Sequence, residues 1–447
     1  MEAQNNLKDR LSSFGLKRSV GRDGHPGDLN DLMRVKKRTS EKSQKAWPLG
    51  CEALKSSVAG SNGWKIRLMG GQGRGTFPVC FNNSKERFIM ARAYNFSAGP
   101  AILPEEVLKQ VQSELLDFNG TGMSIMEMSH RGKDYSAIHT EAIDNLKELL
   151  KIPEGYSVLF MTGGASTQFS LIPMNLLGAG QTADYITAGA WSSKAIKAAQ
   201  KIGTVNEIAN TAKEIPTCVP GNDLSFTDGA AYVHICSNET ISGAQVKEFP
   251  KTDAPLIADM SSDILSRPLD VSQFDMIYAG AQKNLACAGV TLVIIKDELA
   301  AKGPEALPEL FRYQHVLENN SLSNTAPTFP IYIIALVTRW LLANGGLEGM
   351  QKRNEEKAGK LYAAIDASDF YKGTAVTEYR SPMNVTFRLP TEELEAQFVA
   401  EAVAKNMTSL KGHRSVGGIR ASIYNAFPAE GVDALIDFMK EFEAANA

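Results

Sequence analysis

The stretch APLIADMSSDILSRPLDVSQFDMIYAGAQKNLACAG (254–289) contains two short apolar runs, each ended by small or polar residues. The first run ends at Asp259, and a lone lysine, Lys283, follows the second. Apolar runs of this length are typical of strands that are buried on both faces of a parallel sheet. The ends of successive parallel strands meet at one edge of the sheet, so we expect Asp259 and Lys283 to lie close together.

Further apolar runs lie on both sides of this stretch and are bounded by turn residues. They are residues 156–161, 183–189, 230–236 and 290–295, with helical patterns such as 193–202 between them. This alternation predicts an α/β fold in which a large domain, residues 93–345, holds a mostly parallel sheet covered by helices on both faces. A long apolar helix after Pro330 ends at glycines, and a smaller α+β domain of residues 346–447 is predicted to follow.

Residues 1–92 are rich in Lys and Arg, whereas the rest of the chain is acidic. They show little periodicity and contain the Gly-rich stretch 70–75, so we predict a disordered N-terminal extension. Two further interpretations remain open. In the first, the segment is an organellar transit peptide, although its acidic residues argue against this. In the second, the segment precedes a true start at Met90. We therefore expect a cytoplasmic protein, or a plastid or mitochondrial one if the segment is a transit peptide.

The net charge of −3 gives no reason to expect a nucleic-acid or membrane partner. No apolar run approaches the length of a membrane span. The five cysteines are scattered and form no CxxC motif, so we expect free thiols in a reducing compartment and no metal site.

Lys283 and Asp259 are each ambiguous when taken alone. Most lysines are solvated at the surface, but a lysine desolvated at a strand end has a lowered pKa and can form a Schiff base. An acid at the end of a buried strand can cap a helix, but it can also bind a cation such as the pyridinium of pyridoxal phosphate. The two residues together favour pyridoxal phosphate as the cofactor.

Three strand ends carry residues suited to holding such a cofactor. MTGGASTQFSLIPMNLL (161–177) reads as a strand, a Gly-rich turn and a helix, and the start of that helix could bind phosphate with help from Ser166. Trp191 could stack on the pyridine ring, and Thr240 could bond its hydroxyl. An ordinary turn and a core tryptophan remain the simpler alternatives.

Two loops carry clustered cationic residues. EMSHRGKDY (127–135) holds His130 and Arg131, and SLKGHRSVGGIRASIYNA (409–426) holds His413, Arg414 and Arg420. Arginine binds carboxylate and phosphate groups through two parallel hydrogen bonds, so the clusters suggest a substrate with two anionic ends. A solvated basic face is the alternative, although the surrounding glycines favour loops that approach a ligand closely.

The order of these motifs resembles that of the phosphoserine aminotransferase family, which belongs to class V and fold type I of the pyridoxal-phosphate enzymes. NFSAGPAILP, MEMSHRGKDY, CSNETISG, ADMSSDILSRPLDV and SLSNTAPTF fall in the family's order, together with the motifs quoted above. The resemblance runs from Tyr94 to the C-terminus. It implies a seven-stranded, mainly parallel sheet between helices and a homodimer with shared active sites.

The resemblance also implies a role for individual residues. Lys283, Asp259 and Trp191 correspond to the catalytic group. The cofactor-binding residues that it implies are Ala165, Ser166, Trp191, Thr240, Asp259, Gln282, Lys283, Asn324 and Thr325, with the last two reaching the neighbouring subunit's cofactor. The substrate-binding residues that it implies are Ser97, His130, Arg131, His413, Arg414 and Arg420. The chain departs from some relatives at Ser166, where they carry Arg, and at NLACAG (284–289), where they carry Gly-Pro.

The implied activity is transamination between L-glutamate and 3-phosphohydroxypyruvate, which gives O-phospho-L-serine and 2-oxoglutarate in L-serine biosynthesis. Phosphohydroxythreonine is a second candidate substrate. The nearest alternative is another fold-type I transaminase of the alanine or glyoxylate type, and the His-Arg pairs argue against it. A non-catalytic relative would have no chemical need for Lys283 and Asp259.

Overall fold

The computed structural model describes residues 51–54, 65–68, 92–212 and 224–447. The chain divides into two compact units, Met1–Met90 and Ala91–Ala447. In the first unit, β1 (Cys51–Leu54) pairs antiparallel with β2 (Lys65–Leu68). The remainder of the predicted extension, with the proposed start at Met90, lies outside the described residues. Its predicted disorder and its predicted targeting role therefore stay predictions.

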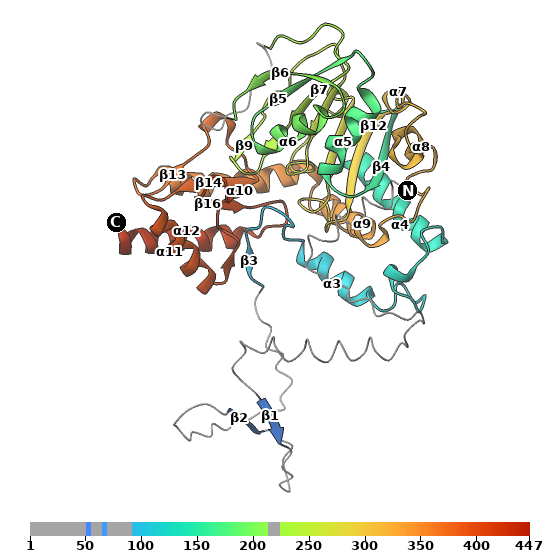
Figure 1. The fold of residues 1–447 in the computed structure, drawn as a ribbon. Coiled ribbons are helices and arrows are strands. Elements are labelled where there is room, and N and C mark those ends of the chain that lie inside the picture. The colour runs from blue at the N-terminus through green and yellow to red at the C-terminus, as the bar shows by residue number, and fades with distance from the viewer. Residues whose placement is uncertain (1–50, 55–64, 69–91, 213–223) are drawn as a thin grey trace, which may run out of the picture. The chain divides into compact units, whose positions relative to one another are not determined.

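A seven-stranded sheet dominates the second unit (Figure 1). In spatial order its strands are β4 (Tyr156–Thr162), β12 (Val290–Lys296), β11 (Met276–Gly280), β10 (Leu256–Asp259), β7 (Val233–Cys236), β5 (Thr182–Thr187) and β6 (Thr204–Asn210). β12 alone runs opposite to the other six strands. The predicted α/β fold with a mainly parallel sheet is confirmed, and every apolar run named above overlaps one of these strands.

Helices cover both faces of this sheet, as Figure 1 shows. The helices of the second unit are α3 (Glu105–Glu114), α4 (Lys133–Leu150), α5 (Ala165–Leu176), α6 (Ala190–Ala199), α7 (Asp297–Ala300), α8 (Tyr313–Glu318), α9 (Thr328–Ala343), α10 (Gly346–Asp366), α11 (Glu392–Ala404) and α12 (Ala429–Asn446). Side chains of β4 alternate between two cores. Val158 and Phe160 pack with α4 and α9, whereas Leu159 and Met161 pack with α5, α6 and α8.

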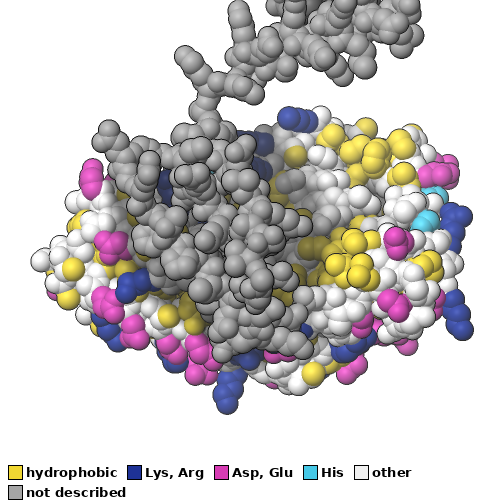
Figure 2. Space-filling view, turned by 90° about the horizontal axis from the view of Figure 1, so that it is seen from below, with side chains coloured by type: hydrophobic (Ala, Val, Ile, Leu, Met, Phe, Trp, Pro, Cys, Tyr) yellow, Lys and Arg dark blue, Asp and Glu magenta, His cyan; other side chains and the backbone are white. Residues whose placement is uncertain are grey.

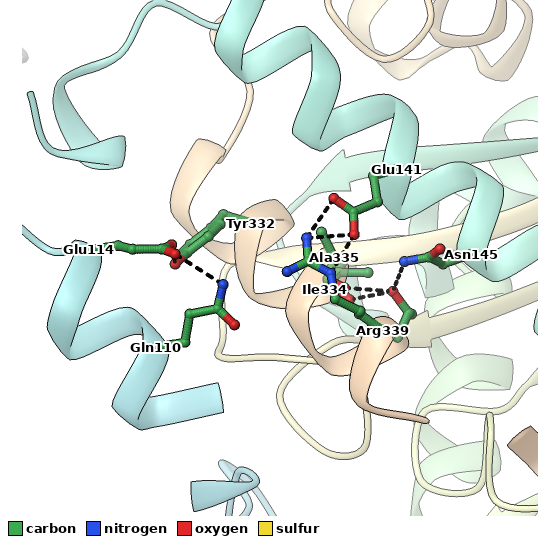
Figure 3. Close-up of polar contacts among 9 residues, drawn as sticks. Gln110, Glu114, Glu141, Asn145, Tyr332, Ile334, Ala335 and Arg339 are labelled. Atoms are coloured by element: carbon green, nitrogen blue, oxygen red, sulfur yellow. Dashed lines mark hydrogen bonds and ion pairs between the residues drawn. The ribbon is translucent and has the colours of Figure 1, made fainter. Parts of the chain in front are cut away.

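Polar contacts fasten α3 and α4 to α9 (Figure 3). The Tyr332 hydroxyl on α9 donates to Glu114 on α3. Arg339, which also lies on α9, donates two parallel hydrogen bonds of 2.8 Å to the carboxylate of Glu141 on α4. These bonds hold the three helices in one layer beneath the sheet. Acidic and basic side chains are mixed along the visible edge of the face in Figure 2, and hydrophobic side chains gather in patches on its right side.

The C-terminal part contains a second core around a small antiparallel sheet of β13 (Lys372–Gly373), β14 (Asn384–Arg388) and β16 (Ile419–Ser422). The remaining strands are β3 (Tyr94–Asn95), which pairs with β15 (Met407–Thr408), and the hairpin of β8 (Asn238–Glu239) and β9 (Ala244–Gln245). The predicted apolar helix is α9, and Gly345 follows it with φ 88°. The boundary predicted at residue 345 stays a prediction.

Short 3-10 helices occupy Ile125–Glu127, Val271–Gln273, Glu309–Phe311 and Thr377–Tyr379. No single helix in the described part of the chain is long and apolar enough to cross a membrane. The pair α9 and α10 passes the same test only when taken together, and the two helices meet at an angle of 82°.

Candidate active site

Asp259 and Lys283 meet at the carboxyl edge of the large sheet, as the sequence predicts. Asp259 is the last residue of β10, and Lys283 lies in the turn that follows β11, the parallel neighbour of β10. The Lys283 Nζ atom lies 5.5 Å from the centre of the Trp191 ring. A Cβ atom on Gly99 would lie 3.4 Å from Lys283 Cγ, so the loop at Gly99 packs against the lysine stem.

Burial shifts the pKa values of both groups toward the neutral form. It lowers the pKa of Lys283 below the ordinary 10.5, although the Asp259 carboxylate opposes the shift. It raises the pKa of Asp259 above 3.8, against the hydrogen bonds of Ser261 and the charge of Lys283. The lysine is therefore poised to act as a free amine. The carboxylate lies where a further cation would stabilise it.

Ser261 orients the Asp259 carboxylate, which is only 5% exposed. The Ser261 backbone N–H and hydroxyl both donate to Asp259 Oδ1, at 2.9 and 2.6 Å. The same hydroxyl accepts from the Gly280 N–H at 3.0 Å, which connects the ends of β10 and β11. Behind them, the Tyr278 hydroxyl lies 2.8 Å from His234 Nε2, and burial lowers the pKa of His234 to about 3.

Trp191 and Thr240 form a pair beside Lys283. The indole Nε1 of Trp191 donates to the Thr240 hydroxyl at 2.8 Å. Trp191 is the second residue of α6, whereas Thr240 follows β8. Lys194 Nζ lies 4.0 Å from the centre of the same indole ring. The pair presents a flat ring and a hydroxyl next to the lysine amine.

The start of α5 has the features of a phosphate site. Its cap residue, Gly164, makes no side-chain cap, and no described residue accepts a hydrogen bond from the N–H of Ala165 or Ser166. Such N–H groups at a helix start favour an anion. The Gln282 amide lies close to these N–H groups. A Cβ atom on Gly280 would lie 2.8 Å from Gln282 Oε1 and 3.4 Å from Ala165 N, so both atoms border the same small space.

The start of α6, by contrast, is already occupied by an acid that the sequence reasoning missed. Glu239 has no exposed surface, and its carboxylate accepts from the N–H groups of Trp191 and Ser192. A single acid between Asn238 and Thr240 gives no signal for this role in the sequence. Of these two helix starts, α5 is therefore the one open to a phosphate.

Arg420 faces this site from β16 of the C-terminal part. Its Nη1 donates to the Thr240 carbonyl at 3.3 Å, and its buried Nε lacks a partner among the described residues. Burial lowers the pKa of Arg420. On the other side, the Tyr424 hydroxyl donates to the Ala98 carbonyl at 2.8 Å, and Ala98 follows Ser97. A half-buried guanidinium with an unused donor is suited to an anionic ligand.

His413 belongs to the same cationic group. Burial first, and then the positive charges of Arg420, Arg414 and Lys194, lower the pKa of His413. Its Nδ1 lies 2.7 Å from the Ser415 hydroxyl, and Arg414 is exposed. The structure therefore brings His413, Arg414 and Arg420 to one region, which lies next to Trp191.

The remaining predicted site residues are not joined to this group. His130 and Arg131 follow the 3-10 helix Ile125–Glu127, and His130 Nε2 is buried without a partner in the described residues. Asn324 and Thr325 are exposed in the loop before α9. No hydrogen bond or ion pair of the described residues links these four to Lys283 or Asp259.

Comparison with known proteins decides the family. The family model "Aminotransferase class-V" matches residues 93–435. The phosphoserine aminotransferase of Geobacillus kaustophilus is 54% identical over 355 residues, which are 79% of this chain and 99% of the relative. The chain belongs to the phosphoserine aminotransferase family. The predicted resemblance is thereby confirmed, and the predicted classification as an enzyme with it.

Solved structures of phosphoserine aminotransferases agree. That from Bacillus circulans subsp. alkalophilus matches with a TM-score of 0.78 and 53% identity, over 80% of this chain and 99% of its own. The pyridoxal-phosphate-bound enzyme from Trichomonas vaginalis matches with a TM-score of 0.75 and 41% identity, over 78% and 100%. An alanine–glyoxylate aminotransferase from Nostoc, at 16% identity and a TM-score of 0.62, shares the fold alone.

Proposed function

We propose that this protein transfers the amino group of L-glutamate to 3-phosphohydroxypyruvate and so forms O-phospho-L-serine and 2-oxoglutarate in L-serine biosynthesis. One observation carries the proposal. At the carboxyl edge of the sheet, Lys283, with a lowered pKa, lies beside the buried Asp259 and faces the Trp191 ring. The family to which the chain belongs catalyses this reaction, and the alanine or glyoxylate alternative is not favoured.

The described residues fit pyridoxal phosphate. When bound, it supplies an aldehyde that links to amines and a ring that takes up the electron pair left by loss of a Cα proton. Lys283 would hold the aldehyde carbon, and Asp259 would hold a proton on the ring nitrogen. Ala165, Ser166 and Gln282 would hold the phosphate at the open start of α5.

Three side chains perform the chemistry that the protein contributes. The Lys283 amine, freed by its lowered pKa, would take the proton from the substrate Cα as a general base and would then deliver it, as a general acid, to the former aldehyde carbon of the cofactor. Asp259, held by Ser261, stays ionised once a cation lies opposite it. Trp191 provides a flat apolar surface that excludes water from one side.

The cationic residues would bind the substrate at both ends. The Nε of Arg420, which has no partner among the described residues, supports its role as the anchor of the α-carboxylate. His413 and Arg414, with His130 and Arg131, would hold the distal phosphate of one substrate and the γ-carboxylate of the other. Ser97 lies in the loop that Tyr424 fastens to the C-terminal part and would bond the substrate carboxylate. Phosphohydroxythreonine has the same anionic groups and remains a second candidate.

We further propose a homodimer in which each subunit completes the other's site. Asn324 and Thr325 are exposed and would reach the partner's cofactor phosphate. Leu116, Met123 and Met126 expose 86%, 44% and 56% of their surface in one short segment before His130. Apolar groups gathered in this way are typical of an interface.

The domain limits 93–345 and 346–447, with a separate extension at 1–92, also stand as a proposal. The free thiols of Cys236 and Cys287 support a reducing compartment such as the cytoplasm. A plastid or mitochondrial location would require the extension to act as a transit peptide.

Replacement of the lysine tests the function. Lys283→Ala should abolish the visible absorption of covalently held cofactor and lower turnover at least about a thousandfold. Lys302→Ala, at an exposed lysine, should change neither. Borohydride reduction of the wild type followed by peptide mass spectrometry should find the cofactor on Lys283. Equal turnover with glyoxylate and with 3-phosphohydroxypyruvate as acceptor would instead support the alternative transaminase.

A further inference from the structure

The carboxylate of Glu239 caps a helix to which it does not belong in sequence. Its Oε1 accepts from the Ser192 N–H at 2.9 Å and from the Ser192 hydroxyl at 2.7 Å. Its Oε2 accepts from the Trp191 N–H at 3.1 Å. These N–H groups are the second and third of α6 and have no partner within the helix. A buried acid from the β8–β9 hairpin thus replaces the side-chain cap that α6 lacks.

Gly189 leaves the space that this arrangement requires. It is the cap residue of α6, and a Cβ atom there would lie 2.4 Å from Glu239 Cδ and 2.5 Å from Oε2. Contacts this short do not occur between real side chains, so any larger residue would displace the carboxylate. Its φ of −179° is ordinary extended backbone, so the requirement is one of space alone.

The capped helix start carries residues that face the cofactor position. Trp191 is bonded to Glu239 through its backbone and to Thr240 through its indole nitrogen. Thr240 directly follows Glu239, and its carbonyl accepts from Arg420. Movement of the Glu239 carboxylate would therefore act on the ring-stacking residue, on the hydroxyl beside it and on the proposed carboxylate anchor.

We propose that Glu239 is a positioning residue which, through the start of α6, fixes the Trp191 indole and the Thr240 hydroxyl where the cofactor ring binds. The proposal rests on the proposed function for the identity of that ring. Glu239 touches neither substrate nor cofactor and acts only through its two neighbours. The charge contributes because a carboxylate at a helix start makes stronger hydrogen bonds than a neutral acceptor.

Replacement by glutamine separates the two halves of the cap. In Glu239→Gln the amide oxygen can still accept both Ser192 bonds, but the amide nitrogen then faces the Trp191 N–H, donor against donor. The variant should fold and lose the bond to Trp191 selectively. Asp184→Asn is the matched control, because Asp184 is also a fully buried carboxylate that accepts a backbone N–H and a hydroxyl, both from Thr227 at 2.7 Å.

Two measurements test the proposal. Titration of cofactor-free full-length protein with pyridoxal phosphate should show affinity about tenfold weaker in Glu239→Gln, since the loss is about one charge-assisted hydrogen bond. Asp184→Asn should stay within about twofold. Fluorescence of Trp191, with Trp47, Trp64 and Trp340 replaced by Phe, should shift to longer wavelength in Glu239→Gln before any cofactor is added.

Gly189 tests whether the space beside the Glu239 carboxylate and the carboxylate itself act together. Gly189→Ala should weaken cofactor affinity by a similar factor, and combination with Glu239→Gln should add little to either single change. If Glu239→Gln matches Asp184→Asn in affinity and in fluorescence, or if the two changes are additive, the positioning role is refuted. The fluorescence of Trp191 is measured without cofactor, so it tests the positioning role of Glu239 alone. The Lys283→Ala variant tests the proposed function separately.

Discussion

Replacement of Lys357 tests how the segment that follows β16 is held within the C-terminal part. Lys357 lies on α10, is 1% exposed, and donates to the carbonyls of Ile423, Tyr424 and Phe427 at 3.0, 2.7 and 3.1 Å. These residues follow β16, which carries Arg420. Each buried carbonyl left without a donor costs about 1–3 kcal/mol. Because Lys357→Met also removes a buried amine, we expect a net loss of about 3–5 kcal/mol.

Lys360, three residues further along α10, provides the control. It pairs with Asp433 at 3.0 Å, and both side chains are well exposed. Such surface pairs contribute about 0–1 kcal/mol, so Lys360→Met should change little. Urea unfolding followed by circular dichroism, with pyridoxal phosphate at one fixed excess, measures both variants. A loss in Lys357→Met no larger than in Lys360→Met would refute the reasoning.

The same lysine should make stability depend on pH. Burial lowers the pKa of Lys357 from 10.5 to about 7, so all three bonds belong to the ammonium form, and the neutral amine above that pH can donate only two of them. Between these values the unfolded chain binds a proton that the folded chain does not, so the free energy of unfolding rises with pH. Below this window both states are protonated and the dependence ends. The difference between wild type and Lys357→Met should therefore widen from about pH 7 to about pH 9, by up to about 1.4 kcal/mol per unit.

Three further predictions concern the site. Asp259→Asn should bind cofactor but lose at least about a hundredfold in kcat, because an amide cannot hold a proton on the ring nitrogen. Ser261→Ala should lose less in kcat, since the carboxylate itself remains. Steady-state kinetics of the two variants measures the difference. Burial lowers the pKa of Lys283, so uptake of cofactor, followed by stopped-flow absorbance, should speed up with rising pH and level off below pH 10.5. Gly163→Ala, where φ is 113° and a Cβ would lie 2.7 Å from Thr167 Oγ1, should weaken cofactor binding about tenfold in equilibrium dialysis.

Much of the fold could be predicted because its signals are local. Strands buried on both faces read as continuous apolar runs, and six of the seven strands were found in this way. The strand that was missed, β6, lies at the edge of the sheet and contains only exposed and partly buried residues, and its sequence has no apolar run. The meeting of Asp259 and Lys283 also followed from the sequence, because parallel strands place their ends together.

The sequence by itself therefore determined six of the seven strands of the sheet, the pairing of lysine with acid at its carboxyl edge and, through the order of its motifs, the family. Only the tertiary structure decided which of two similar helix starts is open to phosphate, because the acid that occupies α6 comes from Glu239, fifty residues from Gly189. It also decided that Lys357, which looks like a surface lysine, is buried against three carbonyls. Both facts depend on contacts between distant segments, and hydrophobic periodicity carries no information about such contacts.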